Sequence, residues 1–249
     1  MRRMYAVALI LGGIIVVGLG AGWLACAGWR SVATHVQDDF SSGAAIDEIR
    51  IRGGSVWVEV HATDDPGVRV HRDVATLNPF AGQPAPSVRL VGSVLELGDV
   101  PGAFRATTYV VTAPLGVRVT AHIGTGSLDL RGVSTVDATV RTGSVAVTDG
   151  SGPLAANVGT GQISATDLRT DTVSATTGTG AILLDLAAPA DVEATTGTGS
   201  VDLKVPAGSY HIDASARVGK VALAIPNDPS GRHHLALRAG MGSVTVAAH

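Results

Sequence analysis

Hydrophobic and polar residues alternate over most of the chain from residue 46 onward, in short runs separated by glycine. After Gly199, for example, Val201, Leu203 and Val205 alternate with polar residues, and the residues before the glycine alternate in the same way. An alternation with a period of two and one apolar face predicts half-buried β-strands. Each unit is therefore expected to be two short strands that meet at a glycine corner.

The glycine corner recurs seven times, at intervals of 17, 18, 19, 19, 20 and 23 residues. A motif that returns at a nearly fixed period is typical of stacked repeats, because a single unit cannot bury its apolar face alone. We therefore predict an all-β fold, a parallel β-helix-like β-solenoid with coils of roughly 18–20 residues. Glycine suits each corner because it tolerates positive φ and close approach of the neighbouring coil. The predicted corner glycines are Gly126, Gly143, Gly161, Gly180, Gly199, Gly219 and Gly242.

The N-terminal region has a different pattern, with 25 consecutive uncharged residues at positions 5–29. This length exceeds the roughly 20 residues that a helix needs to cross a bilayer. Arg2 and Arg3 precede it, which favours a cytoplasmic N-terminus and a single-pass cell-membrane protein with its body outside the cytoplasm. The alternatives, a cleaved signal peptide or lipidation of Cys26, also place the body outside the cytoplasm.

These patterns divide the chain into three expected parts. Residues 1–30 form a cytoplasmic stub and a transmembrane helix, and residues 31–45, which are small and polar, form a linker. Residues 46–249 form the repeat domain, less regular over 46–115 and regular over 116–249.

Composition and charge narrow the range of functions. The 249 residues include 32 Gly and only 4% aromatic residues, a mixture that favours β-strands with many tight turns. The net charge of −3, with no basic patch, argues against nucleic-acid binding. The one cysteine, Cys26, excludes an intrachain disulfide and a cysteine-based metal site.

The glycine-rich corners do not indicate a cofactor site. A phosphate-binding loop needs a helix after the glycines, whereas strand alternation follows them here. A calcium-binding repeat needs aspartate in the turn, but Asp129 and Asp202 fall within predicted strands. The eight histidines show no metal-ligand spacing, and the neighbours His233 and His234 would point to opposite faces of a strand. We predict no catalytic, cofactor-binding or metal-binding residues.

The segment YVVTAPLGVRVTAHIGTGSLDLRGV at residues 109–133, followed by TGSV-like corners, resembles the bacterial "putative adhesin" family of β-strand repeats, a domain of unknown function. The resemblance extends over about residues 46–249. It implies a β-solenoid at the cell envelope, in many members behind a membrane anchor, and it supplies no catalytic residues.

The expected function is non-catalytic. An adhesin-like domain, tied to the membrane by its anchor, would bind an unknown envelope or surface partner. One alternative is a self-assembling scaffold, in which copies associate through the C-terminal coil around Gly242, because no cap follows that coil. The other is a polysaccharide-processing enzyme, which would need clustered carboxylates and aromatic sugar platforms that the sequence does not show.

Overall fold

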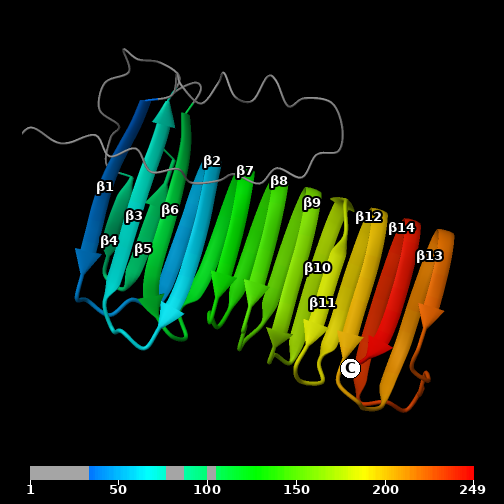
Figure 1. Cartoon of the computed structure of the whole chain (residues 1–249). Helices are drawn as coiled ribbons and strands as arrows, with labels where there is room; N and C mark the ends of the chain where they lie inside the picture. Colours follow the sequence, from blue (N-terminus) through cyan, green and yellow to red (C-terminus); the bar gives the residue numbers. More distant parts are fainter. Residues whose placement is uncertain (1–33, 77–86, 100–104) are drawn as a thin grey trace, which may run out of the picture. The chain divides into compact units, whose positions relative to one another are not determined.

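The computed structural model describes residues 34–76, 87–99 and 105–249, and every element within these ranges is a β-strand (Figure 1). The all-β prediction is confirmed for this part of the chain. The apolar residues 5–29, the proposed anchor, and Cys26 lie outside the described residues. Within the described ranges, no helix has the length and hydrophobicity to span a bilayer. The strands are β1 (Thr34–Ser42), β2 (Glu48–Thr63), β3 (Val68–Thr76), β4 (Val88–Val91), β5 (Val94–Gly98), β6 (Arg105–Pro114), β7 (Arg118–Arg131), β8 (Val136–Thr148), β9 (Leu154–Leu168), β10 (Thr172–Thr179), β11 (Ile182–Leu186), β12 (Asp191–Val205), β13 (Tyr210–Leu223) and β14 (His233–Ala248).

Successive repeat units pair in parallel with matching positions side by side. Thr125 of β7 pairs with Thr142 of β8, which pairs with Thr160 of β9. In the next unit the corner interrupts the strand, so that β10 pairs with the first segment of β9 and β11 with its second segment. Each long strand is therefore two consecutive segments, as the alternation predicts.

The two segments of each unit bury their side chains in one hydrophobic core. In β12 the buried side chains before the corner include Val192 and Ala194, and those after it include Val201 and Leu203. The buried positions thus change from even to odd numbers at Gly199, and both rows belong to the same hydrophobic cluster. In a regular strand the even-numbered and odd-numbered side chains point to opposite faces. The backbone therefore changes its direction at Gly199, and this change lets both rows point into the core.

The seven corner glycines form a column in which each one lies against the backbone of a neighbouring unit. All seven have φ between 140° and 145°, a region that strongly favours glycine. A Cβ placed at Gly199 would lie 1.9 Å from the carbonyl oxygen of Gly180, and one at Gly161 would lie 1.6 Å from that of Gly143. No side chain fits between backbones that approach so closely.

The N-terminal end of the stack is built from shorter strands that flank the first full unit, β2. The first segment of β2 pairs with β5, which forms an antiparallel pair with β4. Its second segment pairs in parallel with β6, and antiparallel β3 and β1 follow. Residues 34–42 therefore form a strand, although the sequence suggested a linker over 31–45. The reason lies in two of its side chains, since Phe40 packs against the core and Asp38 pairs with the buried Arg72.

The C-terminal end differs from the expected order. The strands follow the order β12-β14-β13, so the unit of Gly242 lies inside the stack and the unit of Gly219 forms its edge (Figure 1). Burial gives the reason, because the interior position of β14 buries Leu235 and Leu237 completely. In the parallel register Leu235 faces Ile212, but Leu237 faces only the small Ala214, which stays half-buried at the edge. At this position the larger apolar side chain therefore occupies the covered strand.

Candidate functional sites

The parallel register creates a column of threonines beside the glycine corners. These side chains are all exposed, and each belongs to a different repeat unit. Neighbouring members pair across adjacent strands, which places them about 4.8 Å apart. The column consists of Thr125, Thr142, Thr160, Thr179 and Thr198. Each hydroxyl both donates and accepts hydrogen bonds, so this edge of the stack is a straight row of identical polar groups.

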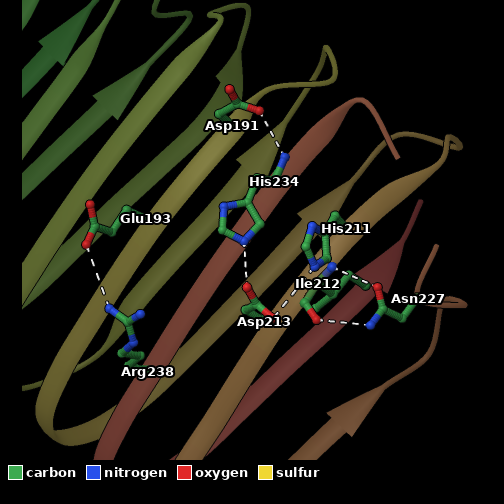
Figure 2. A network of polar contacts seen from close by, with 8 residues as sticks. All are labelled: Asp191, Glu193, His211, Ile212, Asp213, Asn227, His234 and Arg238. Atoms are coloured by element: carbon green, nitrogen blue, oxygen red, sulfur yellow. Dashed lines mark hydrogen bonds and ion pairs between the residues drawn. The ribbon is translucent and has the colours of Figure 1, made fainter. Parts of the chain in front are cut away.

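A second group of polar side chains lies at the C-terminal end, on β13 and β14 (Figure 2). His211 and His234 are direct partners in the parallel register, and Asp213 follows on the same face of β13 two residues later. The Nε2 atom of His234 lies 2.8 Å from one carboxylate oxygen of Asp213, and the Nε2 atom of His211 lies 3.8 Å from the other. The centres of the two imidazole rings are 4.9 Å apart. We call His211, Asp213 and His234 the His-Asp-His cluster.

Contacts from neighbouring elements hold the backbone around this cluster. The N–H of His234 donates to the Asp191 carboxylate at 2.9 Å. On the outer side of β13, the N–H of Ile212 donates to the side-chain oxygen of Asn227 at 2.9 Å, and the Asn227 amide donates to the Ile212 carbonyl at 3.2 Å. Asn227 therefore substitutes for a neighbouring strand at the residue between His211 and Asp213, as Figure 2 shows.

Electrostatics favour the charged carboxylate in the cluster. The hydrogen bond from His234 is the main cause that lowers the pKa of Asp213, and the nearby His211 and Arg238 add to it. Arg238 itself lies 4.0 Å from Glu193. The cluster can thus present an ionised carboxylate together with two imidazole nitrogens.

Reasoning from local spacing missed the cluster because its members come from two distant segments. His233 and His234 do differ in environment: His233 is half-buried, with its ring 6.3 Å from that of Tyr210, whereas His234 is exposed. The useful signal was the repeat interval. Gly219 and Gly242 are 23 residues apart, and the same offset relates His211 to His234.

A third polar group lies at the N-terminal end and is structural. Arg72, only 3% exposed, forms an ion pair with Asp38 and donates to the Ser87 hydroxyl at 2.6 Å. The hydroxyl of Tyr109 donates to the Gly98 carbonyl at 2.6 Å and also contacts Ser87. Burial is the main cause that raises the pKa of Tyr109. These bonds connect β1, β3, β5 and β6, so the network joins the strands at this end of the sheet to one another.

No known family model matches the chain, and no curated protein matches it. Solved structures that resemble it include a putative adhesin from Bacteroides fragilis, 12% identical, which covers 87% of this chain and 97% of that chain with a TM-score of 0.42. A putative adhesin from Parabacteroides distasonis is 15% identical with the same coverages and TM-score. A putative cell adhesion protein from Clostridium sporogenes is 10% identical and covers 87% of this chain and 100% of that chain, with a TM-score of 0.37. At such identities, the function of this chain has to be inferred from its own residues.

Proposed function

We propose that the chain is a non-catalytic cell-envelope protein whose β-solenoid domain is displayed outside the cytoplasm to bind a partner. The apolar residues 5–29 are the basis for the membrane location, with the N-terminus in the cytoplasm. The observation that carries the binding role is the threonine column, in which the parallel register repeats one exposed hydroxyl in five successive units.

A repeating column suits a partner that itself repeats. Each hydroxyl contributes a weak hydrogen bond, of about 0.5–1.5 kcal/mol net. Several such bonds to one molecule act together, because the first contact raises the effective concentration for the next. Stacked backbones fix the spacing before binding, so little conformational entropy is lost. The partner class that matches this arrangement is a polymer with regularly spaced polar groups, such as an envelope polysaccharide.

The test removes the hydroxyls without changing the shape of the column. Thr142→Val, Thr160→Val and Thr179→Val are combined in one variant, since valine is nearly isosteric with threonine and favours strands. Three lost hydrogen bonds predict a weakening of about tenfold or more for binding to purified envelope polysaccharides. The control combines Thr148→Val and Thr166→Val, two threonines that lie outside the column in the second segments of their units.

Two results would contradict the proposal. The first is a column variant that binds the polysaccharides as tightly as the parent protein, or a control variant that loses as much affinity as the column variant. The second is the appearance of cleaved glycan products that vanish when a single carboxylate is replaced, because that result would define a polysaccharide-processing enzyme.

Self-association is a second candidate function, favoured by the free edge of β13. Beyond the part covered by Asn227, this edge exposes the apolar side chains of Val218 (60%), Val221 (42%) and Leu223 (42%). Exposed strand edges of this kind pair readily with other chains. If copies associate here, sedimentation velocity shows larger species as concentration rises, and Val221→Lys abolishes them. A monomer at every concentration excludes this scaffold.

A further inference from the structure

We propose that the His-Asp-His cluster of β13 and β14 is a binding site for one Zn²⁺ ion. This inference is independent of the proposed display function, because the cluster and the threonine column share no residue. The argument rests on the position of the donor atoms, on their chemical type, and on the contacts that fix the strands around them.

The fold brings the three donor atoms together before any ion binds. Nitrogen and oxygen atoms of His211, Asp213 and His234 all lie within 4.8 Å of one another. A tetrahedral Zn²⁺ ion with bonds of 2.0–2.2 Å has its donors about 3.4 Å apart. The widest separation therefore needs to shorten by at most about 1.4 Å, the difference between 4.8 Å and about 3.4 Å, and exposed side chains reach this by small rotations about their side-chain torsions.

The donor set matches zinc and related transition metals. Two imidazole nitrogens and one carboxylate oxygen are ligands that Zn²⁺, Cu²⁺ and Ni²⁺ accept, whereas Ca²⁺ and Mg²⁺ require mostly oxygen. The Nε2 atom of His234 lies 2.8 Å from the Asp213 carboxylate and that of His211 lies 3.8 Å from it, so both imidazole nitrogens are on the carboxylate side that an ion would occupy. Three protein ligands leave at least one coordination position for water or for a donor from a bound partner.

The surroundings of the cluster support an ion with positive charge. Asp191 and Glu193 lie on the neighbouring β12. The Asp191 carboxylate accepts from the backbone N–H of His234, and the Glu193 carboxylate lies 4.0 Å from Arg238. The backbone N–H groups of His234 and Ile212 donate to the side chains of Asp191 and Asn227, which anchors both strands of the cluster to neighbouring elements. These contacts fix the backbone from which the ligands extend.

Other histidine–aspartate contacts in the described residues lack the second imidazole. His71 lies 2.8 Å from Asp39, and His35 lies 2.9 Å from Asp73, but each pair offers only two donors. Over the described ranges, the cluster is the only group of three or more such ligands that lie close enough to share an ion. His71 therefore provides a matched control, with a similar exposed contact and no third ligand.

The experiment measures zinc binding to the full-length protein, kept in solution by a mild detergent because of its apolar residues 5–29. Isothermal titration with ZnCl₂ compares the parent with His211→Ala, His234→Ala and the control His71→Ala. We expect one more equivalent of tightly bound zinc in the parent than in either cluster variant. Loss of one ligand weakens binding at this site at least about tenfold, while the control keeps the parental affinity. Binding elsewhere, for example at Cys26, is common to all variants and cancels in the comparison.

A spectroscopic readout separates ligation from a structural effect. With Cu²⁺ as the probe, electron paramagnetic resonance should show coupling to two imidazole nitrogens in the parent and to one in each cluster variant. Circular dichroism establishes that the variants fold. If one of the histidine variants does not fold, Asp213→Asn, which changes the carboxylate ligand, takes its place in the zinc titration. The proposal is overturned if the folded cluster variants bind zinc like the parent, or if His71→Ala loses as much binding as they do.

Discussion

Replacing Gly199 by alanine should destabilise the repeat stack strongly. Gly199 lies at a corner with φ of 143°, and an added Cβ would lie 1.9 Å from the carbonyl oxygen of Gly180. The nearest atoms belong to backbone rather than to a flexible side chain, so the clash is relieved only if two paired units move apart. The substitution adds a single carbon atom, and its effect therefore reports the corner geometry alone.

The magnitude follows from two contributions. A non-glycine residue held in this region of φ costs about 1–3 kcal/mol. Separating the units weakens at least two backbone hydrogen bonds next to the corner, at about 1 kcal/mol each. Together they predict a loss of at least about 3 kcal/mol in the free energy of unfolding. For a domain of this size, about 1 kcal/mol corresponds to 2–4 °C in Tm, so we expect Tm to fall by about 6 °C or more.

Thermal unfolding followed by circular dichroism measures the difference. The control is Gly43→Ala, because Gly43 has no heavy atom within 4 Å of the added Cβ. The control should unfold within about 2 °C of the parent, since surface substitutions rarely exceed ±0.5 kcal/mol. If Gly199→Ala unfolds together with the control, the close approach at the corner does not limit stability and the reasoning is wrong.

Three further perturbations test other contacts. Asp38→Ala removes the carboxylate that forms an ion pair with the buried Arg72, and chemical denaturation should show a loss of about 1–3 kcal/mol; an unchanged midpoint would contradict this. Hydrogen bonds from two serine side chains and one backbone N–H lower the pKa of Asp228 to about 2, below its ordinary 3.8. Its stabilising effect is thus complete above about pH 3.8 and is lost as the pH falls through about 2, and a carboxyl titration by NMR with a midpoint near 4 would refute it. Asn227→Ala removes the two hydrogen bonds that cover Ile212, so hydrogen exchange should become faster at this amide and stay unchanged in β8.

The regular half of the fold could be predicted because its signals are local. Alternation and the glycine interval appear within each unit, and they define the strands, their inward rows and the corner at Gly161 without knowledge of any distant contact. Residues 34–42 gave no such signal, because the polar composition of β1 is that of a linker and the partners of Phe40 and Asp38 lie in distant parts of the chain.

The arrangement of the last two units depends on competition between them rather than on either pattern alone. Both segments alternate well, and the two units differ in side-chain size at the position where Leu237 of β14 faces Ala214 of β13. The His-Asp-His cluster has the same origin, since it exists only where β13 and β14 pair. Comparing side-chain size at equal positions of the two units would have indicated the order, and comparing polar residues at the 23-residue offset would have indicated the cluster.

The strand order β12-β14-β13 also has a consequence for biosynthesis. Units from β7 to β12 can each dock on the preceding unit as soon as they leave the ribosome, since sequence order and spatial order agree. β13 emerges next but pairs only with β14, which is made after it. The nascent chain must therefore hold β13 unpaired until β14 has been translated and has entered the space beside β12. Translation that stops before His233 would omit β14, so both β12 and β13 would lose the strand with which they pair. The apolar side chains at this end of the domain would then stay uncovered.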